Sequence, residues 1–362
     1  MELLETPAVI VDLDIAERNI ASMAALLKAH GIAHRPHIKT AKSVALARKQ
    51  IAAGAIGITV AKLAEAEVFA RAGFADMLIA HAIFGETKLQ RFAALHCAGR
   101  MVTTVDSDVV AQGLSRVGVE TGKPVDVLVE IDGGLHRGGR QPGQDCAAFA
   151  QAIAGLPGIR IKGVMGYFGT IYRHAGRGDL LAAAREEART LREAVALLRD
   201  VVGKVDIVSA GSSPSALFAG QLGGVTEVRA GNYLFWDASG VAMGLAREDD
   251  CALRVVTTVI STPVPGRATI DAGSKTLSSD RSNHRPGFGI VVGRPAIRLV
   301  ALNEEHGMLE FDPAQESLSV GDRLVVIPNH SCVVPNLCDR LYGIRDGQWV
   351  ETLAVDARGC NY

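Results

Sequence analysis

The stretch KSVALARKQIAAGAIGITVAKLAEAEVFARAGFADMLIAH, residues 42–81, repeats one pattern twice. Residues 42–54 carry apolar side chains at helical spacing and end at a glycine, and the short apolar run GITV follows at residues 57–60. Residues 61–73 show the same spacing and also end at a glycine, and DMLIAH follows at residues 76–81. Because a glycine commonly ends a helix, the stretch predicts two successive helix–strand units.

The same alternation continues on both sides of this stretch, and its clearest helical segment covers residues 179–203. Eight strands that alternate with helices predict an α/β protein built on a (β/α)8 barrel. A doubly wound sheet is the main alternative, but no GxGxxG motif follows an early strand. The eight predicted strands are residues 33–38, 57–60, 76–81, 101–105, 127–131, 161–167, 205–210 and 226–231.

The pattern changes after residue 244. From there on, short β-rich runs are separated by Gly, Pro, Asn or Asp, and no long helical pattern intervenes. Such runs are typical of a β-domain. We therefore expect a barrel domain at residues 1–244 and a C-terminal β-domain at residues 245–362. The early strand at residues 6–13 could pair with the β-domain.

The composition argues against several classes of protein. The 362 residues include 38 basic and 39 acidic side chains, and this net charge of −1 gives no reason to expect nucleic acid or an anionic membrane as a partner. No uncharged apolar run reaches the length of about 20 residues that a spanning helix needs, and the amino terminus lacks the features of a secretion signal. The six cysteines include no CxxC pair, which favours free thiols and a cytoplasmic location.

The segment HRPHIKTAKS, residues 34–43, holds five basic side chains. Its Lys39 follows a predicted strand and precedes a predicted helix, which places it at the active-site end of a barrel of this kind. A lysine that is desolvated there beside His37 and Arg35 would have a lowered pKa, as an imine-forming lysine requires. A solvated basic loop is the alternative that composition leaves open.

Three glycine-rich segments follow other predicted strands. In VEIDGGLHRGG, residues 129–139, two glycine pairs flank Arg137, which could bind an anion or a phenolate or could face solvent. SAGSSPS at residues 209–215 and EVRAGNY at residues 227–233 follow the last two barrel strands, where barrel enzymes usually bind phosphate. Ordinary turns have the same composition, so a phosphate site and plain loops both stay open here.

The segment PNHSC, residues 328–332, places His330 and Cys332 two positions apart, on the same face of an extended strand. Imidazole and thiolate ligands suit Zn²⁺. Two ligands make an incomplete site, so a buried histidine and cysteine are the alternative. Two other features are weaker: DAGSKTLSSDR at residues 271–281 could be a surface loop, and Tyr167 could lie in the core or face the barrel mouth.

In their order along the chain, these segments resemble the D-threonine aldolase / D-serine dehydratase family, whose members use pyridoxal 5′-phosphate (PLP) and share the alanine-racemase fold. The resemblance covers nearly the whole chain. It implies a fold-type III PLP enzyme with a barrel and a C-terminal β-domain, and a head-to-tail homodimer in which the partner's β-domain lines each active site. The segments that carry the resemblance are TPAVIVDLD, RPHIKTAKS, GAIGITVAKLAEAE, EIDGGLHRGG, GYFGT, SAGSSPS, EVRAGNY, DAGSKTLSSD and PNHSC.

The resemblance also implies roles for individual residues. Lys39 would be the Schiff-base lysine, with His37 beside it in the catalytic group. Arg137 would lie near the phenolic oxygen of the cofactor or the substrate carboxylate. Either Tyr167 or Arg229 would face the pyridine nitrogen, and we favour Tyr167. The implied phosphate ligands are Ser212, Ser213, Gly231 and Asn232, and the implied ligands of a zinc or manganese ion are His330 and Cys332.

The family resemblance implies a lyase that acts on D-3-hydroxy amino acids. The first expectation is metal-dependent retro-aldol cleavage of D-threonine-like substrates to glycine and an aldehyde. A dehydratase that converts D-serine or D-3-hydroxyaspartate to a keto acid and ammonia is the alternative, because it needs the same cofactor and metal. An amino-acid racemase is a second alternative, but a racemase needs two opposed bases and has no use for a pair of metal ligands.

Overall fold

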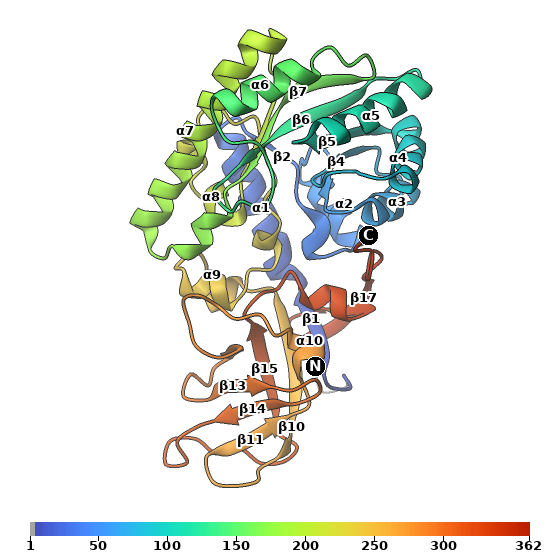
Figure 1. The fold of residues 1–362 in the computed structure, drawn as a ribbon. Coiled ribbons are helices and arrows are strands. Elements are labelled where there is room, and N and C mark those ends of the chain that lie inside the picture. Colours follow the sequence, from blue (N-terminus) through green and yellow to red (C-terminus); the bar gives the residue numbers. More distant parts are fainter. Residues whose placement is uncertain (1–3) are drawn as a thin grey trace. The chain divides into compact units, whose positions relative to one another are not determined.

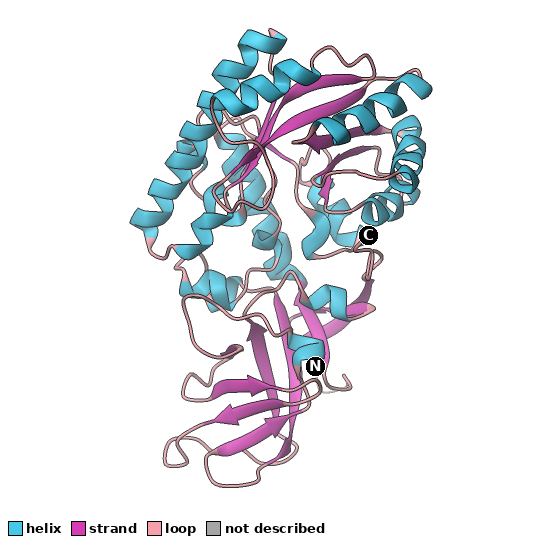
Figure 2. Cartoon of the chain, viewed as in Figure 1, coloured by secondary structure: helices cyan, strands magenta, loops and turns pink. Residues whose placement is uncertain are grey.

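The chain divides into two compact units, which are described separately. The computed structural model describes residues 4–362. Figure 2 shows many helices around the strands of the unit that we call the barrel unit, whereas strands dominate the unit that we call the sheet unit. The barrel unit comprises residues 22–39, 47–231 and 359–362, and the sheet unit comprises residues 4–21, 40–46 and 232–358.

The barrel unit is built on parallel strands, as the sequence predicted. In the described part of the chain eight strands pair in the order β2-β9-β8-β7-β6-β5-β4-β3, and every pairing is parallel. A further parallel bridge between His37 and Thr59 joins the two ends of this order. The predicted (β/α)8 barrel is therefore confirmed. The strands are β2 (Ala33–His34), β3 (Ile58–Val60), β4 (Asp76–Ile79), β5 (Arg100–Val105), β6 (Val125–Asp132), β7 (Ile159–Tyr167), β8 (Ile207–Ala210) and β9 (Glu227–Val228).

Helices connect these strands along the chain (Figure 1). None of the helices in the described residues combines the length and the apolar character that a membrane span requires. The connecting helices are α2 (Val44–Ala52), α3 (Leu63–Arg71), α4 (Glu86–Ala98), α5 (Asp108–Glu120), α6 (Gln144–Ile153), α7 (Arg177–Val202) and α8 (Ser213–Ala216).

Helix α7 shows how the local sequence produces the wall of the barrel. Its apolar side chains recur three or four residues apart, so that one face of the helix is buried and packs on β7 and β8. The helix ends before Gly203, whose φ of 74° suits glycine at a helix end. The helix predicted at residues 179–203 is confirmed. Its buried face includes Leu180, Ala184, Ala188, Leu191, Ala194, Val195 and Leu198.

The buried imidazole of His34 in β2 makes the stability of the barrel depend on pH. Burial lowers the pKa of His34 from its ordinary value of 6.5 to about 4, although a hydrogen bond to the Ala230 carbonyl partly opposes this. Above pH 6.5 the imidazole is neutral in both states and has no effect. As the pH falls from 6.5 to 4, only the unfolded chain takes up the proton, so we expect a loss of up to about 3 kcal/mol of unfolding free energy.

This loss can be measured by urea unfolding at several pH values between 4 and 7.5. The variant His34→Gln keeps an N–H donor for the Ala230 carbonyl but does not titrate, so its stability should fall less steeply over this range. His30→Gln, at an exposed position, should behave like the wild type. Parallel curves for the wild type and His34→Gln would contradict the prediction.

The sheet unit contains a nine-stranded sheet within the described residues. Its strands follow the order β11-β14-β13-β12-β15-β10-β1-β16-β17, and an additional pairing of β10 with β11 closes the first six into an antiparallel barrel. The early strand β1 pairs antiparallel with β10 and parallel with β16. The strands are β1 (Ala8–Asp12), β10 (Leu253–Ser261), β11 (Arg267–Ile270), β12 (Gly289–Val291), β13 (Arg298–Leu302), β14 (Gly307–Glu310), β15 (Arg323–Pro328), β16 (Arg340–Arg345) and β17 (Gln348–Ala354).

Several short elements of the sheet unit were not predicted from the sequence. The apolar run of strand β16 is brief, with an arginine at each end and a glycine inside it. Part of the polar segment 271–281 forms a one-turn helix, which is too short to show a helical period. The helices of this unit include α9 (Ala238–Ala242) and α10 (Ser274–Leu277), and α1 (Leu13–Ala29) begins in it.

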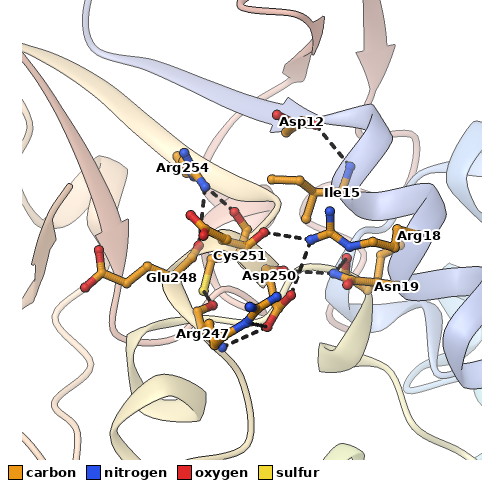
Figure 3. A network of polar contacts seen from close by, with 11 residues as sticks. Asp12, Ile15, Arg18, Asn19, Arg247, Glu248, Asp250, Cys251 and Arg254 are labelled. Atoms are coloured by element: carbon orange, nitrogen blue, oxygen red, sulfur yellow. Dashed lines mark hydrogen bonds and ion pairs between the residues drawn. The ribbon is translucent and has the colours of Figure 1, made fainter. Parts of the chain in front are cut away.

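The first turns of α1 are tied to the segment 232–251, which leads into β10 (Figure 3). Arg18 Nη2 donates to the Asp249 carbonyl at 2.7 Å, and Nδ2 of the buried Asn19 donates to the Asp250 carbonyl at 2.9 Å. A buried amide that satisfies a backbone carbonyl holds an otherwise irregular segment in place. These contacts fix the residues that follow Gly231.

Candidate active site

Lys39 lies just beyond the carboxyl end of β2. The chain leaves β2, forms a single parallel bridge at His37 and enters a 3-10 turn at Ile38–Thr40. The side chain of Lys39 is exposed, whereas the residues on both sides of it are buried. The structure therefore places Lys39 at the strand end that carries the active site in barrel enzymes.

The imidazole of His37 lies within the electrostatic reach of three cations. Burial lowers the pKa of His37 well below its ordinary value, and the charges of Lys39, Arg229 and Arg137 lower it further. Its Nδ1 atom is buried and has no hydrogen-bond partner among the described residues. The cations follow three different strands, β2, β9 and β6. An unsatisfied polar atom near three cations fits the binding of an anionic cofactor.

Glycine and aspartate shape the loop after β6 that carries Arg137. A β-carbon on Gly133 would lie 2.3 Å from the Tyr167 carbonyl oxygen, so only glycine allows this close approach to β7. Asp132 Oδ1 accepts a hydrogen bond from the Gly134 N–H at 2.9 Å. The Arg137 guanidinium lies over the ring of Tyr167, 4.8 Å from its centroid. Arg137 and Tyr167, which the sequence suggested separately, thus form one contact.

Arg229 is buried inside the barrel and held at two nitrogens. Its Nη1 donates to Ser209 Oγ at 2.8 Å, and its Nη2 donates to the Gly166 carbonyl at 2.7 Å. Burial lowers the pKa of Arg229, and the nearby Glu227 carboxylate opposes this effect. Glu227 also accepts a hydrogen bond from Ser209 Oγ at 2.7 Å. These contacts fix the plane of the guanidinium group.

Arg35 has a structural role instead of the tuning role that the sequence suggested. Its side chain is buried, and its guanidinium donates to Glu227 Oε2 at 2.9 Å and to Asp76 Oδ1 at 2.6 Å. Two carboxylates compensate its charge inside the barrel wall.

The segment with Ser212 and Ser213 follows β8, and several of its polar groups form hydrogen bonds within the segment itself. The Ser212 N–H donates to Ser215 Oγ at 2.9 Å, and Ser212 Oγ accepts from the Ser215 N–H at 3.4 Å, so that Ser212 caps α8. Gly211 has a φ of 83°, and a β-carbon there would lie 2.6 Å from Val228. Both serines are buried. Both the N–H and the Oγ of Ser212 are therefore engaged within this turn.

The side chain of Asn232, which follows the buried Gly231, is directed toward the His-x-Cys segment. Its Nδ2 lies 2.8 Å from Asp237 Oδ2, 2.9 Å from Ser331 Oγ and 3.6 Å from Cys332 Sγ. Two amide hydrogens are thus shared among three acceptors. Any contact between Asn232 and a phosphate would have to come from its backbone.

His330 and Cys332 follow β15 in the sheet unit. His330 Nδ1 lies 2.7 Å from Asp280 Oδ2, and a carboxylate on one ring nitrogen orients the other toward a metal. Although burial lowers the pKa of His330, the charge of Cys332 and the hydrogen bond to Asp280 outweigh this effect and raise the pKa. Cys332 Sγ lies 3.1 Å from the hydroxyl of Thr40, the residue after Lys39.

This donor set fits a divalent metal with two protein ligands. Imidazole nitrogen and thiolate sulfur are ligands that Zn²⁺ accepts readily. In the part of the chain that the structure describes, no group of three or more His, Cys, Asp or Glu side chains could hold a metal. A metal bound by His330 and Cys332 would therefore keep open positions for water or substrate, as catalytic sites do.

Sequence reasoning missed three residues that support this pair. Asp280 lies in the polar segment 271–281, where its carboxylate was one of several polar groups. The hydroxyl of Thr40 contacts Cys332 Sγ. The carboxylate of Asp237 accepts a hydrogen bond from the Ser331 N–H. No local pattern marks any of them, because each partner is separated from it by dozens of residues or more.

The fold and these residues define the class of the protein. Residues 11–239 match the family model described as alanine racemase, N-terminal domain. Residues 252–344 match the model described as putative serine dehydratase domain. The chain therefore belongs to the alanine-racemase-like family that joins such a barrel to a serine-dehydratase-type domain, and the resemblance drawn from the sequence is confirmed.

Particular relatives cover nearly all of the chain. D-threo-3-hydroxyaspartate dehydratase of Delftia sp. (strain HT23) is 38% identical over 348 residues, which are 91% of each chain. D-threonine aldolase of Arthrobacter sp. is 32% identical and covers 98% of this chain and 93% of its own. The crystal structure of D-threonine aldolase from Filomicrobium marinum has a TM-score of 0.92 and 32% identity, and the match covers 99% of this chain and 97% of that one.

Solved structures of D-threo-3-hydroxyaspartate dehydratase include two alanine variants, in addition to the enzyme from Delftia sp. HT23. One replaces a histidine, and the other replaces a cysteine two positions further on and is described as a metal-free form. The wild-type structure has a TM-score of 0.90 and covers 97% of both chains. The spacing of the two substituted residues equals that of His330 and Cys332 in this chain.

Proposed function

We propose that the protein is a PLP- and metal-dependent lyase that acts on D-3-hydroxy amino acids. The observation that carries the proposal is the combination of two sites in one chain. Lys39 lies at a barrel strand end with further cations near it, and His330 is held by a carboxylate two residues before Cys332. PLP-dependent cleavage or elimination at a β-hydroxyl group needs a lysine and a Lewis acid, and the two sites would supply them.

In the barrel, Lys39 would provide the amine that binds the cofactor's aldehyde carbon. PLP, when bound, supplies an electron sink for the bond that breaks. Arg137, over the ring of Tyr167, would pair with the phenolic oxygen or with the substrate carboxylate. Tyr167 and Arg229 remain the two candidates for the pyridine nitrogen. His37, which its surroundings keep neutral, would be the residue beside Lys39 in the catalytic group.

The phosphate of the cofactor would be held by the segments that follow β8 and β9. Ser212 and Ser213 at the start of α8, and Gly231 and Asn232, are the proposed contacts. Because the side chains of Ser212 and Asn232 and the N–H of Ser212 are engaged within the protein, other backbone N–H groups of these segments would carry most of this binding.

A zinc or manganese ion would be held by His330 Nε2 and Cys332 Sγ. The ion, when bound, would polarise the β-hydroxyl group of the substrate. The metal-free form of a cysteine variant of D-threo-3-hydroxyaspartate dehydratase supports this assignment, because the histidine and cysteine substituted in that enzyme have the same spacing as His330 and Cys332. We also propose a cytoplasmic homodimer with shared active sites and a domain boundary at residues 244/245.

The reaction itself follows from which proton is removed. Retro-aldol cleavage requires loss of the β-hydroxyl proton, which breaks the Cα–Cβ bond and leaves glycine and an aldehyde. Elimination requires loss of the α-proton and departure of the β-hydroxyl group, which leads to a keto acid and ammonia. We propose the aldolase reaction first and dehydration of D-serine or D-3-hydroxyaspartate as the alternative. The similar proteins include both a dehydratase and an aldolase. A racemase would have no use for the pair of metal ligands, His330 and Cys332.

One assay tests the proposed function. The PLP-loaded protein is incubated with Mn²⁺ or Zn²⁺ and, separately, with D-threonine, D-serine and D-threo-3-hydroxyaspartate, with the L-enantiomers as controls. Glycine plus an aldehyde identifies the aldolase, and a keto acid plus ammonia identifies the dehydratase. Chelation should abolish turnover and added metal should restore it. Interconversion of D- and L-alanine without metal would contradict the proposal.

A further inference from the structure

One loop of the sheet unit is fastened to the His-x-Cys segment at two neighbouring residues. Asn329 Nδ2 donates to the carbonyls of Asp280 and Gly287, at 3.1 Å and 2.8 Å, and so holds both ends of the loop at residues 280–287. The next residue, His330, contacts the Asp280 carboxylate through Nδ1. Asn329 itself is almost fully buried. The ends of this loop are therefore held by the residue next to His330, and its Asp280 contacts that proposed metal ligand.

Arg285 in this loop carries a charge that no carboxylate neutralises. Its Nη1 donates to Asn329 Oδ1 at 2.9 Å, and among the described residues it forms no ion pair. The side chain is half-buried, and burial lowers the pKa of Arg285, with Glu248 as the acidic group that opposes this. Other arginines of the same unit, Arg294 and Arg298, are paired with glutamates.

A half-buried guanidinium with free donors is costly unless an anion binds to it. The hydrogen bond to Asn329 Oδ1 uses one of the five N–H donors of the guanidinium group, and a planar fork of N–H groups matches a carboxylate. If the metal at His330 and Cys332 takes the β-hydroxyl group, the other substituent on the same carbon is also near the His-x-Cys segment. That substituent is a methyl group in D-threonine and a carboxylate in D-3-hydroxyaspartate.

We propose that Arg285 binds a carboxylate on the β-carbon of the substrate, and that the enzyme therefore prefers D-3-hydroxyaspartate to D-threonine and D-serine. This inference rests on the proposed function and narrows its substrate class. A methyl group or a hydrogen at that position would leave the desolvated guanidinium without its partner, and a site of this kind rejects such analogues by roughly 100-fold or more.

The test compares Arg285→Gln and Arg285→Lys with a matched control, Arg281→Gln. Arg281 belongs to the same loop but is exposed and stacked 4.9 Å from the Phe288 ring centroid. For Arg285→Gln, the ratio of kcat/KM for D-threo-3-hydroxyaspartate to that for D-serine should fall about 100-fold, mostly through KM. Arg285→Lys should recover part of the ratio, and Arg281→Gln should keep the wild-type ratio.

A binding measurement gives a readout that does not depend on turnover. The dicarboxylate D-malate and the monocarboxylate D-lactate are titrated into the metal-loaded holoenzyme by calorimetry. The wild type should prefer D-malate, and Arg285→Gln should lose this preference. An equal loss of activity on both substrates in Arg285→Gln, or an unchanged malate preference, would overturn the inference. If the wild type turns over no D-3-hydroxy amino acid but its malate preference depends on Arg285, the proposed function fails and the assignment of Arg285 stands.

Discussion

Replacing Lys39 by alanine is expected to remove the visible absorbance of bound PLP and to lower kcat by at least about 1,000-fold. Lys39 is the residue to which PLP is proposed to attach covalently, and a noncovalent contact from another side chain cannot replace that bond. The lysine also lies among the cations near His37, so its loss removes one charge from the site. Both effects act at the reacting centre, which explains the large expected change.

The measurement is an absorbance spectrum of the protein reconstituted with PLP, followed by the assay with D-threo-3-hydroxyaspartate and D-threonine. Lys28→Ala, on the exposed end of α1, is the control and should show the wild-type spectrum. Lys39→Arg keeps the positive charge but cannot form the covalent bond, so it should also be colourless. A wild-type spectrum for Lys39→Ala would contradict the central assignment.

The second large effect is expected for His330→Ala and Cys332→Ala, which should retain less than about a tenth of the metal of the wild type and lose activity in proportion. With only two protein ligands, each ligand contributes a large share of the metal affinity. Asp280→Asn should weaken metal binding by about 10- to 100-fold, because the amide orients the imidazole less well than the carboxylate does. Metal content can be measured by elemental analysis after dialysis.

Cys338→Ala is the matched control for this pair. Cys338 belongs to the same unit, and its thiol donates to the carbonyls of Val334 and Pro335. This variant should keep the wild-type metal content. Activity of Asp280→Asn should recover when the metal concentration is raised, since its ligands remain. Full metal content in both His330→Ala and Cys332→Ala would exclude the proposed site.

The barrel strands and the position of Lys39 could be predicted because each depends on a short stretch of chain. Apolar runs, helical spacing and terminal glycines are local signals, and they located all eight strands and helix α7. The glycine-rich loop before Arg137 was also visible, since close packing of Gly133 on Tyr167 demands glycine. Strand β16 was missed because its apolar run is short, lies between two arginines and contains a glycine.

What the polar side chains do could not be predicted in the same way. The sequence placed Arg35 beside Lys39, but the fold pairs it with Glu227 and Asp76. The side chain of Asn232, expected at a phosphate, points to Asp237 and Ser331 instead. In each case the choice of partner depended on segments far away in the chain.

The sequence by itself determined the parallel barrel, the β-rich remainder and the presence of a lysine and a His-x-Cys pair, because periodicity and spacing act over a few residues. Only the tertiary structure decided which carboxylate holds His330, which amide holds Arg285 and which cations reach His37. A chain of this length offers many polar side chains to each donor. Packing of the distant strands and loops is what leaves one partner within hydrogen-bond distance.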